Sequence, residues 1–143
     1  MNPTNCICVI VLFVSIFAIS KANNSRIVDL NTKCGANAED SQVVLQYRVP
    51  STDTGKCLML CFLKELDMLD SNQKYDEVKS FQAFRNFWSA FTDDVLKAVN
   101  SAAAVFAKGI DSKSGTCEYG YEIMKFINAE FIKNQLLTTT PKQ

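Results

Sequence analysis

The sequence predicts an all-α fold, a compact bundle of about six helices around an apolar cavity, tied by two disulfides. Three observations lead to this class. Apolar residues recur at helical spacing along most of the chain, four cysteines follow a predicted export signal, and nearly half of the 143 residues are hydrophobic. No repeat, low-complexity tract or long linker interrupts the pattern. Residues 23–143 are therefore expected to form a single domain.

Residues 1–22 are expected to be a cleaved signal peptide. The apolar run from Cys6 to Ile19 spans fourteen residues and is followed by small residues, whereas a bilayer span needs roughly 18. Cleavage after Ser20 or after Ala22 would suit signal peptidase, and we prefer Ala22. A membrane anchor is the alternative, but the run is short and no Lys or Arg precedes it. We expect a secreted, extracellular protein without membrane insertion.

Charge and composition exclude several classes of function. Fifteen basic and fifteen acidic residues are interspersed, so a nucleic-acid partner, which requires clustered Lys and Arg, is not expected. The chain contains no histidine, which removes Ser-His and Cys-His nucleophile pairs, histidine metal ligation and an imidazole pH switch. A carboxylate pair or a Ser-Lys arrangement remains formally open. We expect no enzyme, no cofactor and no metal.

Four cysteines follow the predicted signal, namely Cys34, Cys57, Cys61 and Cys117. Paired disulfides are favoured over a zinc site, because only Cys57 and Cys61 are close in sequence. These two lie in a segment of strong helix formers, residues 56–66, where neighbours four apart have Cβ atoms about 6 Å from each other. A disulfide needs roughly 3.8 Å. This leaves Cys34–Cys61 with Cys57–Cys117, or Cys34–Cys57 with Cys61–Cys117.

The expected helices follow from apolar periodicity and from turn residues between the periodic segments. A short helix is expected at residues 36–46, and the cysteine helix follows from about residue 54. Two amphipathic helices are expected at 76–91, capped by its first residue, and at 93–107. The last covers 117–134. The faces expected to point inward carry Val95, Val99, Ala102 and Phe106 in the fourth of these helices, and Tyr121, Met124, Ile127 and Phe131 in the last.

An aromatic stripe marks the helix expected at 76–91. Phe81, Phe84, Trp88 and Phe91 are spaced by three, four and three residues, which places them on one helical face, and Phe87 widens the stripe. The ordinary interpretation of such a stripe is a hydrophobic core. A core face can also be the wall of a cavity, so the stripe is compatible with both.

The cysteine helix and its surroundings resemble the insect odorant-binding proteins, a family of pheromone-binding and general odorant-binding proteins. In that family three residues separate the second and third cysteines, as they separate Cys57 from Cys61, and residues 66–76 look like the family's turn between its third and fourth helices. Cys34 would be the first cysteine. Cys117 looks like the fifth, since eight residues separate it from the position of the sixth.

The chain departs from the family pattern at two positions. The sixth position holds Phe126, and the stretch around Phe106, where the fourth cysteine should lie, has no cysteine. Fourth and sixth are bonded partners in the family, so their joint absence leaves no orphan thiol. The resemblance then implies Cys34–Cys61 and Cys57–Cys117. We expect Phe106 and Phe126 to pack where the third bridge would stand, with a looser chain end and a more adaptable cavity.

The resemblance implies reversible, non-covalent binding of an odorant, a pheromone or another small hydrophobic molecule in extracellular fluid. A membrane receptor or a second copy of the chain are further partners to consider. A secreted interaction protein, such as a salivary or reproductive-fluid factor that binds another protein on the same scaffold, is the alternative. A polar ligand end could meet Tyr119, Tyr121 or Thr92. The twelve residues expected to line the cavity are Leu58, Phe62, Leu66, Phe81, Phe84, Trp88, Phe91, Val95, Val99, Tyr121, Met124 and Ile127.

Overall fold

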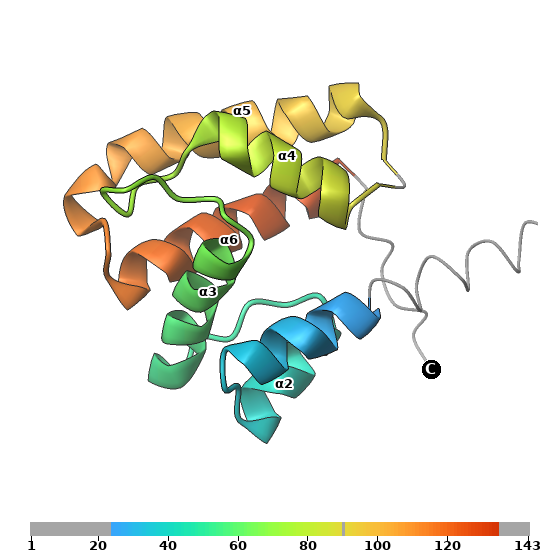
Figure 1. Cartoon of the computed structure of the whole chain (residues 1–143), viewed down its shortest axis with the longest axis vertical. Helices are drawn as coiled ribbons and strands as arrows, with labels where there is room; N and C mark the ends of the chain where they lie inside the picture. Colours follow the sequence, from blue (N-terminus) through green and yellow to red (C-terminus); the bar gives the residue numbers. More distant parts are fainter. Residues whose placement is uncertain (1–23, 90, 135–143) are drawn as a thin grey trace, which may run out of the picture.

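The helices of the chain are set out in Figure 1, a computed structural model that describes residues 24–89 and 91–134. Residues 24–33 are helical. The following elements are α2 (Ala38–Leu45), α3 (Asp53–Glu65), α4 (Glu77–Phe87), α5 (Asp93–Gly109), the short 3-10 helix η1 (Asp111–Lys113) and α6 (Cys117–Lys133). Apart from one isolated bridge between Leu69 and Tyr75, the described residues contain no β-structure. The predicted all-α class is confirmed, whereas the predicted signal peptide, residues 1–22, lies outside the described residues.

Side-chain caps fix where four of the helices begin. The first turn of a helix leaves backbone N–H groups without partners, and an N-cap oxygen can accept from one of them. In each case the acceptor lies three residues before the donor: Asn37 accepts from the N–H of Asp40, Thr52 from Gly55, Asp76 from Lys79 and Thr116 from Tyr119, at 2.8, 3.0, 3.0 and 3.2 Å. The expected cap at Asp76 is therefore present.

The helix predicted at 76–91 is shorter in the structure, where α4 ends at Phe87. Trp88 leaves helical geometry with φ −112° and ψ 47°, and Thr92 is already the extended N-cap of α5. The chain must turn between these residues so that α5 can pack beside α4. The helix at residues 24–33 was not predicted, although Ile27 and Leu30 are three residues apart and both are buried.

The inward face of α5 also differs from the expected one. Val99 is buried as predicted, but Leu96 and Asn100 are buried beside it, whereas Val95 is only half-buried. The buried amide of Asn100 has its partners inside the fold. Its Oδ1 accepts from the Tyr75 hydroxyl at 2.6 Å and its Nδ2 donates to the Glu77 carbonyl at 2.7 Å. Hydropathy alone places an asparagine on the outside of a helix, so the predicted inward face of α5 is rotated from the one that is buried.

The helices form two packed groups that share α3 and α4. In Figure 1, α4 and α5 lie along the top, α6 crosses beneath them, α3 descends from it, and α2 and the helix at residues 24–33 lie below. A bundle cluster of buried residues joins α3, α4, α5 and α6, and includes Leu63, Phe84, Ile123 and Phe131. A second group, the N-terminal cluster, consists of Ile27, Leu30, Val44, Leu58, Met59, Phe62 and Phe87.

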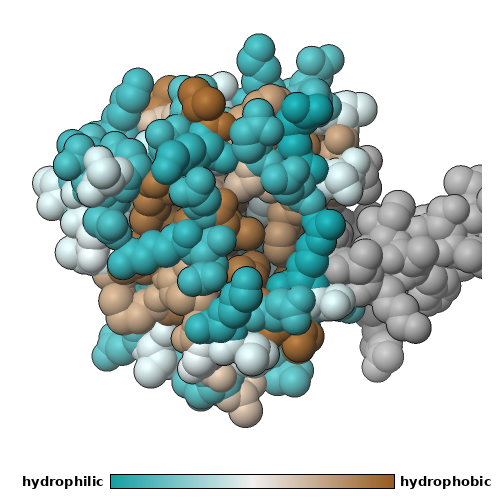
Figure 2. Space-filling model, viewed as in Figure 1, coloured by the Kyte–Doolittle hydropathy of each residue, from teal (hydrophilic) through white to brown (hydrophobic). Residues whose placement is uncertain are grey.

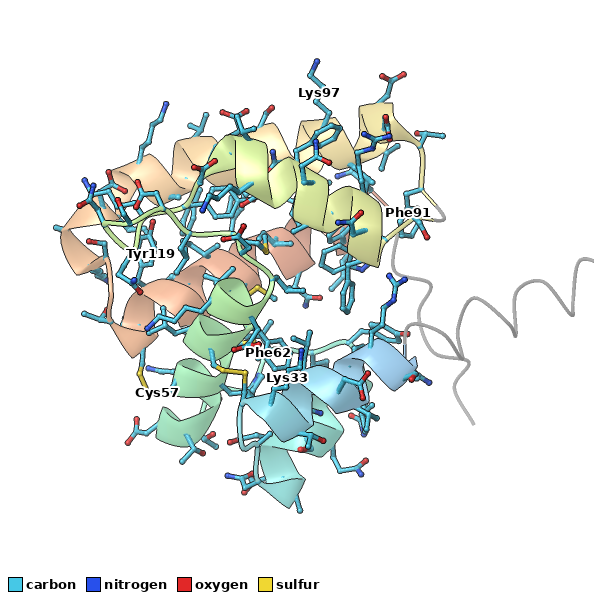
Figure 3. All side chains as sticks on the ribbon, in the orientation of Figure 1. Lys33, Cys57, Phe62, Phe91, Lys97 and Tyr119 are labelled. Carbon is cyan, nitrogen blue, oxygen red and sulfur yellow. A yellow bond between two sulfur atoms is a disulfide. The ribbon has the colours of Figure 1, made fainter. Side chains whose placement is uncertain are left out.

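Both disulfides are anchored on α3. Cys61 pairs with Cys34 at the end of the first helix, with Cα atoms 5.9 Å apart, and Cys57 pairs with Cys117 at the start of α6, with Cα atoms 4.3 Å apart. Figure 3 shows the second of these at the labelled Cys57. This is the pairing that the family resemblance implies. The two bridges thus hold the N-terminal helices and α6 to one helix.

Helices α3 and α6 approach each other closely at Gly120. A Cβ atom built on Gly120 would lie 2.4 Å from the Cα of Leu60 and 2.5 Å from its backbone nitrogen. Real carbon atoms do not come so near, and backbone atoms cannot move aside as a flexible side chain can. Position 120 therefore accepts only glycine at this helix separation, three residues beyond Cys117.

Phe106 of α5 and Phe126 of α6 stack on each other. Their ring centroids are 4.4 Å apart and their planes differ by 8°. The expectation that these two rings pack together, where the family's third bridge would join the same two helices, is confirmed. Both rings are only half-buried, so the stack stabilises the pairing of α5 with α6 without the covalent restraint of a disulfide.

The Phe106–Phe126 stack can be measured with a double-mutant cycle. Phe106→Ala, Phe126→Ala and the double variant should give a coupling free energy of about 0.5–1.5 kcal/mol in urea unfolding, because paired rings gain this much beyond their separate burial. If the stability losses of the two single variants sum to that of the double variant within about 0.3 kcal/mol, the rings do not stabilise each other.

Asp40 joins α2 to the start of α3. Its carboxylate is buried and accepts hydrogen bonds from the hydroxyls of Thr52 and Thr54, each at 2.6 Å, and from the amide of Asn37 at 3.0 Å. Burial alone would raise the pKa of Asp40, but the hydrogen bonds from Thr52, Thr54 and Asn37 outweigh it and hold the pKa below its ordinary value. The charged form is therefore the one that fits the fold.

Asp40→Asn should lower the unfolding free energy by about 1–3 kcal/mol at pH 7, because hydroxyl donors lose a charged acceptor. The contribution of Asp40 is fully present above the ordinary carboxyl pKa of 3.8 and is lost as the pH falls through its lower pKa in the folded state. Urea unfolding at pH 7 and pH 3 should show the difference between the two proteins shrinking in acid. Glu39→Gln, an exposed neighbour on α2, is the matched control, and an equal loss there would contradict this role for Asp40.

Candidate ligand-binding cavity

An apolar cavity of about 80 Å³ lies between the N-terminal helices and the bundle. Twelve of its fifteen lining residues are apolar, and they come from the helix at residues 24–33, from α2, α3, α4 and α6, and from the segments that follow α2, α3 and α4. The lining residues are Ile27, Leu30, Val44, Tyr47, Arg48, Val49, Met59, Phe62, Leu66, Phe87, Trp88, Met124, Ile127, Asn128 and Phe131. Figure 2 shows this face of the protein hollowed near its centre, with hydrophobic side chains lying deeper than the hydrophilic ones around them.

The cavity occupies the seam between the two hydrophobic clusters. Leu66, Trp88 and Met124 pack against both clusters, and all three line the cavity. The remaining apolar lining is shared between the groups, with Leu30 and Met59 from the N-terminal cluster and Ile127 and Phe131 from the bundle cluster. Each cluster is packed within itself, and space remains where the two meet.

One wall of the cavity is a group of aromatic rings at the end of α4. Trp88 has its ring centroid 4.6 Å from that of Phe87 and 5.1 Å from that of Phe131, and Phe84 lies behind it at 5.2 Å. Tilted and edge-to-face rings at these distances attract each other, so this wall is well defined. Met59 and Met124 line other parts of the cavity, and their unbranched side chains can change shape at low cost.

Arg26 fastens the first helix to the same end of α4. Its guanidinium Nη1 donates to the backbone carbonyl of Asn86 and, at 3.4 Å, to that of Phe87. These are carbonyls of the last turn of α4, which carries the negative end of the helix dipole and lacks intrahelical partners. The contact connects two segments that line the cavity and lie 61 residues apart in sequence.

Five of the twelve residues expected to line the cavity do so: Phe62, Leu66, Trp88, Met124 and Ile127. Phe62, labelled in Figure 3, extends from α3 between the N-terminal helices and the bundle. These five belong to the apolar faces of three predicted helices. The structure brings them to one space because α3, α4 and α6 all border the seam.

The other seven do not line it, and they are Leu58, Phe81, Phe84, Phe91, Val95, Val99 and Tyr121. Phe84 and Val99 are surrounded by other side chains of the bundle cluster. Leu58 is packed in the N-terminal cluster. Phe91 follows the end of α4 and packs near Phe131, with ring centroids 6.2 Å apart. Periodicity identifies buried faces, but it does not say which of them meets an open space.

Ten lining residues were not among those expected: Ile27, Leu30, Val44, Tyr47, Arg48, Val49, Met59, Phe87, Asn128 and Phe131. Two of them carried a usable signal, since Phe87 widens the aromatic stripe and Phe131 belongs to the predicted inward face of the last helix. Ile27 and Leu30 could have been found from their spacing of three. The turn after α2 gave no such signal, because its residues are not periodic.

The residues expected to meet a polar ligand end, Tyr119, Tyr121 and Thr92, lie outside the cavity lining. Tyr119 is wholly buried in the bundle cluster, and its hydroxyl accepts from the backbone N–H of Tyr75 at 2.8 Å, away from the cavity. Burial raises the pKa of Tyr119 and keeps its hydroxyl neutral. Tyr121 lies under the ammonium groups of Lys56 and Lys125, 5.1 and 5.5 Å from its ring centroid. Neither residue lines the cavity.

No group of three or more His, Cys, Asp or Glu side chains in the described part of the chain could hold a metal ion. None of the fifteen lining residues is a carboxylate, a cysteine or a lysine. The arrangement offers apolar contact and a few hydrogen bonds. Among the helices of residues 24–89 and 91–134, none has the length and hydropathy of a membrane span.

Comparison with known proteins gives the family. A solved structure, the odorant-binding protein dmelOBP28a from Drosophila melanogaster, matches with a TM-score of 0.60 and 21% sequence identity, over 86% of this chain and 98% of that one. At this identity the match shows a common fold. A search of curated proteins gives no match. The model of the PBP/GOBP family matches residues 20–126, which is well over half of the sequence, and the chain therefore belongs to that family.

Proposed function

We propose that this protein is a secreted carrier that reversibly binds and solubilises a small hydrophobic ligand, such as an odorant or a pheromone, in the cavity between its two hydrophobic clusters. The observation that carries the proposal is the apolar lining of that cavity, to which five helices contribute. Membership of the PBP/GOBP family supports the same function. The name of the matched structure describes an odorant-binding protein as well.

Burial of apolar surface would supply the binding free energy. A ligand that hides about 200 Å² of apolar surface gains roughly 5 kcal/mol at about 25 cal/mol per Å². This gain corresponds to a Kd of about 0.2 mM, and the lost freedom of the ligand offsets part of it, so affinities in the millimolar range follow for the smallest volatiles and larger apolar ligands bind more tightly. The absence of paired acid and base groups from the lining fits a carrier that releases its ligand unchanged.

The cavity must widen when a ligand enters. Its volume of about 80 Å³ is near half of the roughly 150 Å³ that accommodates benzene in an engineered cavity. Widening is feasible at this place because the cavity is a seam: the helix at residues 24–33 and α2 can shift against the bundle while each cluster keeps its own packing. Met59 and Met124 can also change rotamer. The family bridge that this chain lacks would have restrained α5 against α6.

Secretion is part of the proposal. Residues 1–22 would be removed as a signal peptide, and residues 23–143 would form the mature domain. Two disulfides are the usual reinforcement of a small exported domain and persist in an oxidising compartment. A membrane receptor and a second copy of the chain stay predictions.

The alternative of a protein-binding factor has less support. That reading needs a contiguous apolar patch on the surface. Four large hydrophobic side chains are exposed in the described part of the chain, each on a different helix: Val28, Val78, Val105 and Ile132. Single exposed apolar residues are ordinary on protein surfaces. The apolar cavity therefore supports ligand binding better than these residues support protein binding.

A pair of valine substitutions tests the site. Val44 lines the cavity from α2, whereas Val95 lies on α5 outside it and is half-buried. Val44→Phe should fill the space and weaken the binding of the fluorescent dye phenylnaphthylamine at least tenfold, because dye and ring compete for the same volume. Trp88, which lines the cavity and is the single tryptophan, reports binding through quenching or energy transfer.

Val95→Phe is the matched control and should bind the dye with unchanged affinity. Unfolding in urea must first show that both variants are folded. Equal affinity of the wild-type protein and Val44→Phe would place the dye elsewhere. Absence of saturable uptake by the oxidised wild-type protein, with competing volatiles and fatty acids also without effect, would remove the carrier function.

A further inference from the structure

The polar part of the cavity lining carries charge of one sign. Three of its fifteen lining residues are polar, namely Tyr47, Arg48 and Asn128, and Arg48 alone is charged. No Asp or Glu is among the lining residues. Twelve apolar residues together with one cation match the two parts of an amphiphile, an apolar body and a negatively charged head.

The turn that carries Tyr47 and Arg48 has an unusual backbone. Helix α2 ends in a Schellman motif, in which the N–H of Tyr47 donates to the carbonyl of Val44 at 2.9 Å and the N–H of Arg48 donates to that of Val43 at 3.1 Å. Tyr47 occupies the left-handed position with φ 56°, where glycine is the usual residue and a bulky side chain is strained. Strained residues cluster at functional sites, and of the three non-glycine residues with positive φ in the described chain, Tyr47, Asp67 and Gln73, Tyr47 is the one that lines the cavity.

The strained turn directs three consecutive side chains to the cavity. Tyr47, Arg48 and Val49 all line it, although neighbouring residues in an extended chain alternate in direction. A glycine at position 47 would satisfy the backbone but would remove one of these side chains. The hydroxyl of Tyr47 donates to Oδ1 of Asn24 at 3.2 Å, which ties the turn to the first helix.

The charge of Arg48 is not matched by an acid within the described residues. Its Nη2 donates to Oε1 of Gln46 at 2.5 Å, and this partner is neutral. The four ion pairs among the described residues involve Lys56, Lys74, Lys79 and Arg85. A guanidinium has five N–H donors in a planar fork that suits a carboxylate. Apart from the bond to Gln46, those of Arg48 have no partner among the described residues and are open to a ligand.

We propose that the cavity prefers ligands with a carboxylate head on an apolar chain, and that Arg48 binds the carboxylate at the mouth while the chain enters the seam. The proposal rests on the carrier function and names its ligand class. Arg48 is exposed and Asn128 of α6 is half-buried, so the head group stays near water while the chain is buried. Burial raises the pKa of Tyr47, so its hydroxyl is neutral and adds no negative charge that would repel an anion.

Three ligands of one chain length test the preference: octanoate, octanol and octylammonium, titrated at pH 7 and low salt into the oxidised mature protein with Trp88 fluorescence and calorimetry. We expect octanoate to bind about tenfold more tightly than octanol, because a charge-assisted pair with arginine is stronger than a neutral hydrogen bond. Octylammonium should bind more weakly than octanol.

In Arg48→Gln, octanoate and octanol should bind with equal affinity, since the substitution removes the positive charge and keeps a polar side chain. Arg85→Gln is the matched control. Arg85 lies on α4 outside the cavity, pairs with Asp93 at 3.3 Å and faces the Phe81 ring, so the ratio should persist in this variant. Both arginines are exposed, and neither change should unfold the protein.

The outcomes separate this inference from the carrier function. Octanoate and octanol binding with equal affinity, or a ratio that survives in Arg48→Gln, would overturn the preference for carboxylates and leave the carrier function standing. Failure of all three ligands and of phenylnaphthylamine to bind would overturn both.

Discussion

Helix α3 is the element on which the rest of the structure depends. One of its faces presents Cys57 toward α6 and the same face presents Cys61 toward the first helix, so two covalent ties leave from one turn of helix. Gly120 allows the backbone of α6 to lie against Leu60. A bridge of this kind contributes roughly 2–4 kcal/mol, chiefly by restricting the unfolded chain. With α3 fixed on both sides, the N-terminal helices and the bundle can each be packed against it.

The cavity is a consequence of this arrangement. Two clusters that are held to α3 and share α4, with Leu66, Trp88 and Met124 packed against both, leave a seam which neither cluster fills. The ties at Cys34, Asp40 and Arg26 keep the seam from opening completely. A space that is restrained at its edges and lined by adaptable side chains can admit a ligand and release it, which is what a carrier requires.

The cysteine framework and the helical class could be predicted because they depend on local spacing. Cys57 and Cys61 lie four residues apart on strong helix formers, and the family resemblance supplied their partners. The cavity wall was predicted only in part, because Phe84 and Trp88 share one face of the predicted helix, yet Phe84 is enclosed by the bundle cluster whereas Trp88 borders the cavity. That difference arises from how distant segments pack. The turn at Tyr47 escaped prediction since its left-handed backbone favours glycine, and no periodicity marks it.

The central claim, that ligand binds in the seam between the two clusters, is tested most directly by the methionine methyl groups. Met59 and Met124 line the cavity, whereas Met68, which is as deeply buried as Met59, lies in the bundle cluster and does not line it. In NMR spectra of the mature protein labelled with ¹³C at its methionine methyl groups, titration with octanoate or phenylnaphthylamine should shift Met59 and Met124 with one common affinity. Intermolecular NOEs should connect both methyl groups to the ligand, and Met68 should give none. Saturable binding that produces contacts with Met68 alone, or with no methionine, would contradict the account.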